Sequence, residues 1–159
     1  MTGFRRKDAL ELGSFLFFMF GFSFLFNFFW EALHAVYLYE SHDLDASIYV
    51  PMLLYVSSMD GLIILGLYIG VGAMWMNFFW IKSFRKTQLF VFAGIGVSIA
   101  AIIETLSVFY YHRWVYKKLM PTVFGIGISP LVQFSITGLL ALWLNRELLY
   151  GRGLFRNRL

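Results

Sequence analysis

The segment LGSFLFFMFGFSFLFNFFW, residues 12–30, contains no charged residue and decides the class of fold. At a rise of 1.5 Å per residue, a helix of about 20 apolar residues crosses the hydrocarbon core of a bilayer. Over the whole chain, 60% of the residues are hydrophobic and 14% are charged. Soluble domains carry roughly 25% charged residues, so this chain has too few for a soluble surface of its size. The sequence therefore predicts an integral membrane protein.

Three further apolar runs extend this prediction to an all-α fold, a bundle of four transmembrane helices in a single domain, residues 1–159. The expected spans are residues 12–38, 50–81, 89–112 and 130–149. Ser129 and Pro130 form a start signal for the fourth helix, with Ser as N-cap and Pro in the first turn.

Glycine and other small residues indicate where the helices touch and where the chain leaves helical structure. Gly66 with Gly70, and Gly94 with Ser98, have the four-residue spacing of close helix contacts in membranes. The Gly-rich segment 120–129 is too irregular for a helix. We expect it to fold back into the mouth of the bundle, where protein or water can satisfy its backbone.

Lysine and arginine residues indicate the orientation, because they concentrate on the cytoplasmic side of a membrane. Ten of the 13 lie at the chain ends and in the loop 82–88, whereas Arg113, Lys117 and Lys118 lie on the other side. We therefore expect both termini to be cytoplasmic, in a multi-pass protein of the cell membrane. The net charge of +4 fits anionic headgroups, so the expected partners are membrane lipids and not nucleic acid. Because there is no cysteine, disulfides, thiolate catalysis and iron–sulfur clusters are excluded.

Three carboxylates interrupt the apolar runs, where a charged side chain costs about 2.5–3.5 kcal/mol on insertion. The helical rise places Glu31, Asp60 and Glu104 on three helices, each about 12 Å from the outer end of its helix. Three carboxylates at one depth predict a shared polar pocket in the outer half of the membrane. His34 lies one turn after Glu31 on the same face. These four residues are the candidate catalytic groups.

Other polar and aromatic residues join this pocket through helical spacing or by reaching back from the outer interface. The candidate substrate-binding residues are Asn27, Trp30, Ser57, Tyr111, Arg113 and Gln133. Several have a second interpretation: Asn27 and Gln133 also suit hydrogen bonds between helices. Arg113 also suits a structural ion pair with Glu31 or Glu104. His34 also suits the headgroup region, and Tyr111 suits the aromatic belt.

Glu31 and His34 also form a Glu-x-x-His pair, the spacing used by di-iron helix bundles. If a metal is bound, the candidate ligands are Glu31, His34, Asp60 and Glu104. A full di-iron site has two such pairs and this chain has one, so no cofactor is expected and a metal ion is kept as an alternative.

Two stretches, NFFWEALHAVYLY (27–39) and RWVYKKLMPTVFGIGISPLVQ (113–133), carry a resemblance to a family of small prokaryotic four-span membrane proteins. The pattern is NxxWExxH followed by MPxxxGxGxSPLxQ, and it implies the four-span fold without assigning a function. A fainter similarity connects the chain with the emopamil-binding and sterol-isomerase superfamily. That group has small bundles with carboxylates and tryptophan around a lipid pocket, and here it serves only as an analogy.

Three functions remain open on the residues alone. The first is an enzyme or binding protein for a lipid or isoprenoid, in which one carboxyl group donates a proton and another accepts one. In that case Trp30 could stabilise a cationic intermediate through its π face. The second is a proton- or cation-binding transport component, which four helices would support best as a homo-oligomer. The third is an accessory or assembly protein in which the carboxylates fix helix register.

Overall fold

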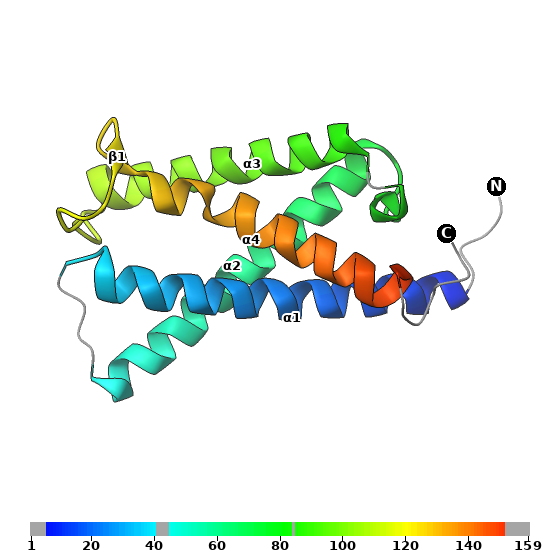
Figure 1. Ribbon diagram of the computed structural model, residues 1–159, viewed down its shortest axis with the longest axis horizontal. Helices are drawn as coiled ribbons and strands as arrows, with labels where there is room; N and C mark the ends of the chain where they lie inside the picture. The colour runs from blue at the N-terminus through cyan, green and yellow to red at the C-terminus, as the bar shows by residue number, and fades with distance from the viewer. Residues whose placement is uncertain (1–5, 41–44, 84, 152–159) are drawn as a thin grey trace.

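The computed structural model describes residues 6–40, 45–83 and 85–151, which form a helical bundle with one short β-hairpin (Figure 1). Four helices are long and apolar enough to cross a membrane, which confirms the all-helical class. They are α1 (Arg6–Tyr37), α2 (Ala46–Met74), α3 (Lys86–Thr105) continued by the π-helical turn η2 (Leu106–Tyr110), and α4 (Ile128–Arg146) continued by the turn η3 (Glu147–Gly151). Among the basic residues used for orientation, Arg5, Arg152, Arg156 and Arg158 lie outside the described residues.

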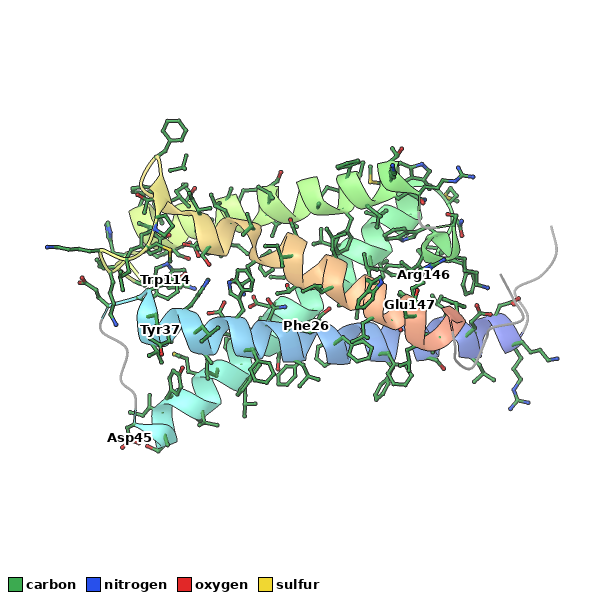
Figure 2. The ribbon with its side chains drawn as sticks, in the orientation of Figure 1. Phe26, Tyr37, Asp45, Trp114, Arg146 and Glu147 are labelled. Atoms are coloured by element: carbon green, nitrogen blue, oxygen red, sulfur yellow. The ribbon has the colours of Figure 1, made fainter. Side chains whose placement is uncertain are left out.

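The helices pack mainly as α1 with α2 and α4, and as α3 with α4, whereas α2 and α3 share a smaller contact. In Figure 1, α2 approaches α3 at one end of the bundle and diverges from it toward the other. We call the end with the hairpin the hairpin end, and the end where α1 begins and η3 ends the terminal end. Figure 2 places Trp114 at the hairpin end and Arg146 and Glu147 at the terminal end. Asp45, at the start of α2, lies well away from Trp114.

The second apolar run does not continue as helix to Ile81, so that predicted boundary is wrong. Helix α2 ends at Met74, and Met76 has a positive φ of 50° in the turn that follows. The side chain of Asn77 accepts a hydrogen bond from the backbone of Phe79 at 2.9 Å, which stabilises this turn. The rest of the run forms a short 3₁₀ turn, η1 (Trp80–Lys82), that folds back under the bundle. Of the apolar residues after α2, Trp80 and Ile81 are fully buried in protein, whereas Trp75, Met76 and Phe78 are exposed. The other predicted boundaries differ by a few residues at helix ends.

The residue at the centre of this returning loop is Trp80, which is completely buried. Its indole N–H donates to the backbone oxygen of Tyr68 at 3.2 Å, and its ring stacks on that tyrosine. Phe15 from α1 and Phe92 from α3 pack around the pair. A dense aromatic core therefore fills the terminal half of the bundle. The Phe-rich first helix contributes to this core through Phe15, which is 1% exposed.

The predicted small-residue contacts are wrong. A Cβ added to Gly66, Gly70 or Gly94 would meet nothing within 4 Å. The close approaches are made by other glycines: a Cβ on Gly138 of α4 would lie 2.8 Å from the ring of Phe92. A Cβ on Gly96 of α3 would lie 3.0 Å from the hydroxyl of Ser135. Spacing alone does not tell which face of a helix turns inward.

The segment expected to fold back into the mouth of the bundle forms a hairpin instead. Strands β1 (Thr122–Val123) and β2 (Ile126–Gly127) pair antiparallel. Both central residues of the turn have positive φ, 52° at Phe124 and 78° at Gly125. This is the backbone of the tight turns that match the twist of a two-stranded ribbon. Gly125 suits it, whereas a bulky aromatic residue at Phe124 is strained there.

Candidate functional site

A cavity of about 500 Å³ lies in the hairpin half of the bundle, bordered by all four helices. Three of its lining residues are the carboxylates Glu31, Asp60 and Glu104, which helical rise had placed at one depth. Much of the remaining wall is apolar and comprises Ala35, Met52, Leu53, Val56, Ala100, Ile103, Pro130 and Phe134. The lining residues that are exposed, Tyr55 and Arg113, mark its opening, between α2 and the segment that follows η2.

The floor of the cavity is organised by one amide, the side chain of Gln133 in the first turns of α4. Its nitrogen Nε2 lies 2.6 Å from Glu31 Oε1, 3.0 Å from Asp60 Oδ2 and 3.0 Å from Asn27 Oδ1. Helices α1 and α2 are thus both tied to α4 through a single atom. Gln133 and Asp60 are buried, with 4% and 7% of their surface exposed.

The hydrogen count at this amide is informative. A glutamine side chain has two N–H groups, whereas three oxygens surround this nitrogen. The hydroxyl of Thr137 lies 3.3 Å from Asn27 Oδ1 and closer, at 2.7 Å, to the backbone oxygen of Gln133. With the single hydroxyl hydrogen of Thr137 on that nearer backbone oxygen, one oxygen of the group is left for a proton or for a donor on a ligand. The position of the group at the edge of a cavity makes either source available.

Glu104 is held separately, by the segment that follows η2. The indole N–H of Trp114 donates to its Oε2 at 3.3 Å, and the hydroxyl of Tyr116 donates to the same oxygen. Burial, reinforced by the bond to Glu104, raises the pKa of the Tyr116 hydroxyl, so it remains a donor. Neither Trp114 nor Tyr116 was among the candidate pocket residues predicted from the sequence.

The segment 113–127 forms a cap over this end of the bundle. The backbone of Glu40 donates to Val115 at 2.8 Å, and that of Lys117 donates to Leu38 at 2.9 Å. Tyr39 and Tyr116 meet in an isolated β-bridge between the cap and the end of α1. We call residues 113–127 the cap. The cap covers the hairpin end of the bundle. The exposed lining residue Tyr55 lies on α2, so the cavity opens at the side of the bundle, next to α2.

The other predicted site residues lie near the cavity but do not line it. His34 is buried, and its Nε2 is hydrogen-bonded to the hydroxyl of Ser129 at 2.7 Å. The ring of Trp30 meets that of His34 edge to face. Ser57 is fully buried, and its hydroxyl has no partner among the described residues. Tyr111 is exposed at the surface. Geometry thus brings Glu31, Asp60, Glu104, Gln133 and Arg113 to the cavity. It leaves these four residues outside the lining, together with Asn27, which contacts Gln133 behind it.

Arg113 lines the cavity, but within the described part of the chain it forms no ion pair with Glu31 or Glu104. Its guanidinium group lies 5.2 Å from the centre of the Tyr111 ring. The structural ion pair considered for Arg113 is therefore not formed. In residues 6–40, 45–83 and 85–151, no group of three or more His, Asp or Glu side chains could hold a metal ion. The proposed metal ligands divide instead between Gln133, Ser129 and the cap.

Sequence reasoning missed a second group of buried polar residues, at the terminal end. Glu11 is 2% exposed and lies 2.5 Å from the ammonium group of Lys82. Asn145 is fully buried and donates to the backbone oxygen of Phe15 at 2.8 Å. The signal was available, because Glu11 precedes the first apolar run by one residue. Four-residue steps connect Glu11 through Phe15, Met19 and Ser23 to Asn27 on one buried face.

Comparison with known proteins adds no relative: no protein-family model, no curated protein and no solved structure matches this chain. The resemblance carried by the two sequence motifs stays a prediction. The functional argument therefore rests on the geometry of the cavity.

Proposed function

We propose that this chain is an integral membrane protein that binds a lipid- or isoprenoid-like amphiphile in the cavity. The apolar part of the ligand lies against the walls formed by α2 and α3, and its polar end meets Glu31, Asp60 and Glu104. The observation that carries the proposal is that all three carboxylates line one cavity of about 500 Å³ with a largely apolar remaining wall. Ligand pockets of roughly 300–1,000 Å³ combine apolar walls with a few polar groups in this way.

The direction of the opening supports a ligand that arrives from the membrane. Tyr55 marks the opening and lies in the first half of α2, one of the four apolar helices. The cap closes over the end of the bundle through its bonds to Leu38, Glu40 and Glu104. A molecule dissolved among the lipid chains would reach the cavity between α2 and α3 without crossing the cap.

The hydrogen count at Gln133 supports a ligand that brings a donor group. A hydroxyl or ammonium group placed against Glu31 and Asp60 would supply the hydrogen that the amide lacks. Two carboxyl groups that share one donor also suit acid–base chemistry, in which one protonates a substrate and the other accepts a proton. Catalysis of that kind is the enzymatic form of the same proposal.

The alternative of a transport component is less well supported. Between the Gln133 group and the ion pair of Glu11 with Lys82, the interior is mainly apolar, and Met19, Ile64 and Val71 are each fully buried there. The buried polar side chains of this layer include the uncharged Ser23, Thr137 and Asn145. The four helices carry no Asp, Glu, Lys, Arg or His in this layer, so it offers no titratable group for a proton or cation path.

The proposed orientation places the hairpin end outside the cell and both termini in the cytoplasm, in accordance with the distribution of Lys and Arg. Reporter fusions test it directly. A fusion after the last residue should behave as cytoplasmic, and one inserted in the loop 40–47 as external. An external readout at the C-terminus would exclude this orientation.

Ligand occupancy tests the binding proposal. The protein is purified in mild detergent from its membrane, and bound lipid is measured by native mass spectrometry. Glu31→Gln keeps the volume of the side chain and removes the carboxylate, so we expect ligand occupancy to fall at least tenfold while the protein stays folded. Glu40→Gln, an exposed carboxylate beside the cap, is the matched control and should bind as the wild type does.

A double mutant separates binding from a scaffold role. If Glu31 only stabilised the fold through Arg113, Glu31→Gln would lower the melting temperature and Arg113→Gln would restore it. Because Arg113 and Glu31 form no ion pair, we expect no such rescue. Recovery of stability in the double mutant, with unchanged ligand occupancy in Glu31→Gln, would overturn the binding proposal.

A further inference from the structure

The tip of the β1–β2 hairpin combines backbone strain with nearly complete exposure. Phe124 has a φ of 52°, a region that bulky L-residues rarely occupy, and 96% of its surface is exposed. At the first central position of such a turn, Asn or Gly would relieve the strain. Among the described residues, no packing of the Phe124 side chain compensates this strain.

The surroundings of the tip indicate which kind of partner suits this side chain. A Cβ added to Gly125 would lie 3.0 Å from the ring of Phe109, so the turn rests directly on η2. Phe109 continues an exposed apolar line along α3 that includes Ile102 and Leu106. This line lies on one of the four helices that are apolar enough to cross a membrane. Phe124 therefore extends a surface that already suits lipid chains.

Charge on the cap fits the same partner. Lys118 is exposed, and Arg113 is exposed next to Tyr111. Basic and tyrosine side chains beside an apolar aromatic tip match the order of phosphate groups and acyl chains at a bilayer surface. In Figure 1, the hairpin stands beside the end of α3, with its tip directed to the side of the bundle.

We propose that the β1–β2 hairpin anchors the cap to the lipid leaflet, with Phe124 inserted among the lipids beside Phe109. This anchor rests on the proposed membrane insertion of the four helices and does not depend on the ligand of the cavity. The cap contacts the bundle through the hydrogen bonds of Trp114 and Tyr116 to Glu104. In this proposal the hairpin gives the cap a second contact, with the lipid leaflet.

The absence of cysteine allows a clean test by site-directed spin labelling. Phe124→Cys, Lys118→Cys and Ile102→Cys are each labelled with a nitroxide in nanodiscs of phosphatidylcholine and phosphatidylglycerol. Collisions with oxygen report lipid, and collisions with a water-soluble nickel chelate report water. We expect the ratio of oxygen to nickel collisions at position 124 to be severalfold higher than at Lys118 and closer to that at Ile102.

A second pair of variants carries the label at position 123, next to the tip. It shows whether the labelled hairpin contacts lipid when Phe124 itself is still present. In Val123→Cys, Phe124 remains in place, and we expect low collision rates with nickel. Adding Phe124→Asn should raise these rates severalfold, because the turn is relieved of strain and loses its anchor. Unchanged rates on adding Phe124→Asn would overturn the anchor.

The reference positions keep the two proposals distinguishable. Nickel access at Ile102 would contradict membrane insertion itself. Lipid exposure at Ile102 together with nickel access at positions 123 and 124 would overturn the anchor alone. Spin–spin broadening at position 124 that disappears on dilution with unlabelled protein would identify a second copy of the chain as the partner, which would also overturn the lipid anchor.

Discussion

The two halves of the bundle place their buried polar groups in different surroundings. At the terminal end, Glu11 meets Lys82 at 2.5 Å, and aromatic rings around Trp80 fill the neighbouring space. At the hairpin end, Glu31 and Asp60 accept hydrogen bonds from the amide of Gln133 at the edge of a cavity, and among the described residues no cation pairs with them. A carboxylate with a cation in a packed core stabilises one arrangement of helices. Carboxylates that share one amide beside a cavity remain available to a ligand.

The two halves therefore differ in role: the packed terminal half stabilises the arrangement of the helices, and the hairpin half contains the proposed ligand-binding cavity. Each of the following variants tests that difference, because it should change one half and spare the other.

The largest effect is expected for Trp80→Ala. Removing a fully buried tryptophan from a packed core costs about 4 kcal/mol, through lost contacts and the cavity that remains. Thermal unfolding in nanodiscs measures this, and the lipid occupancy of the protein that remains folded should not change. Trp143→Ala, at an exposed tryptophan, is the control and should unfold near the wild-type temperature. Equal losses for the two variants would mean that the returning loop does not support the core.

Gln133→Leu should have the next largest effect, and it should affect both stability and binding. Leucine has a similar size but leaves Glu31, Asp60 and Asn27 without their shared donor, at a cost of about 3 kcal/mol. Chemical denaturation together with lipid occupancy measures the two effects in one preparation. Gln88→Leu, a buried amide on α3 near the terminal end, should leave occupancy unchanged. If Gln133→Leu still binds the ligand, the amide is not part of the site.

A smaller effect is expected where α4 meets α3. Gly138→Ala would push a methyl group against the ring of Phe92, because the added Cβ lies only 2.8 Å away, and such overpacking costs about 2 kcal/mol. Gly66→Ala, where nothing lies within 4 Å, should be neutral or slightly stabilising through higher helix propensity. The melting temperatures of the two variants show which glycine lies at a helix contact: Gly138, as the packing indicates, or Gly66, as the four-residue spacing predicted. A larger drop in melting temperature for Gly66→Ala than for Gly138→Ala would favour the helix contact predicted from the sequence.

The smallest effect is expected at the start of α2, which is exposed. Hydrogen bonds from the hydroxyl and the backbone of Ser47 lower the pKa of the Asp45 carboxyl below its ordinary value of 3.8. A carboxyl group whose pKa is lower in the folded state stabilises the fold above its unfolded pKa. That contribution is lost as the pH falls below 3.8 and through the folded value. Asp45→Ala should flatten this part of the pH–stability curve, and an unchanged curve would exclude Asp45 as a significant cap.

Several features of the site could be read from the sequence because they follow from helical rise. Counting residues from the helix ends placed Glu31, Asp60 and Glu104 at one depth, and the structure brings them to one cavity. The roles of Trp114 and Tyr116 could not be read in this way, because they reach Glu104 from a segment without regular structure. Gln133 was a candidate, but its hydrogen bonds to both α1 and α2 depend on how α4 is rotated.

The sequence by itself determined the helical class and the number of apolar helices, because hydropathy and helix length are local properties of the chain. Only the tertiary structure decided where the second apolar run stops being a helix, which glycines are contacts and which carboxylate has a cation. Those outcomes depend on the rotation and crossing of helices, which are set by side-chain packing between segments far apart in the sequence. Trp80 illustrates the difference: it lies in the predicted second span, residues 50–81, and the fold places it beyond the end of α2 and buries it in protein.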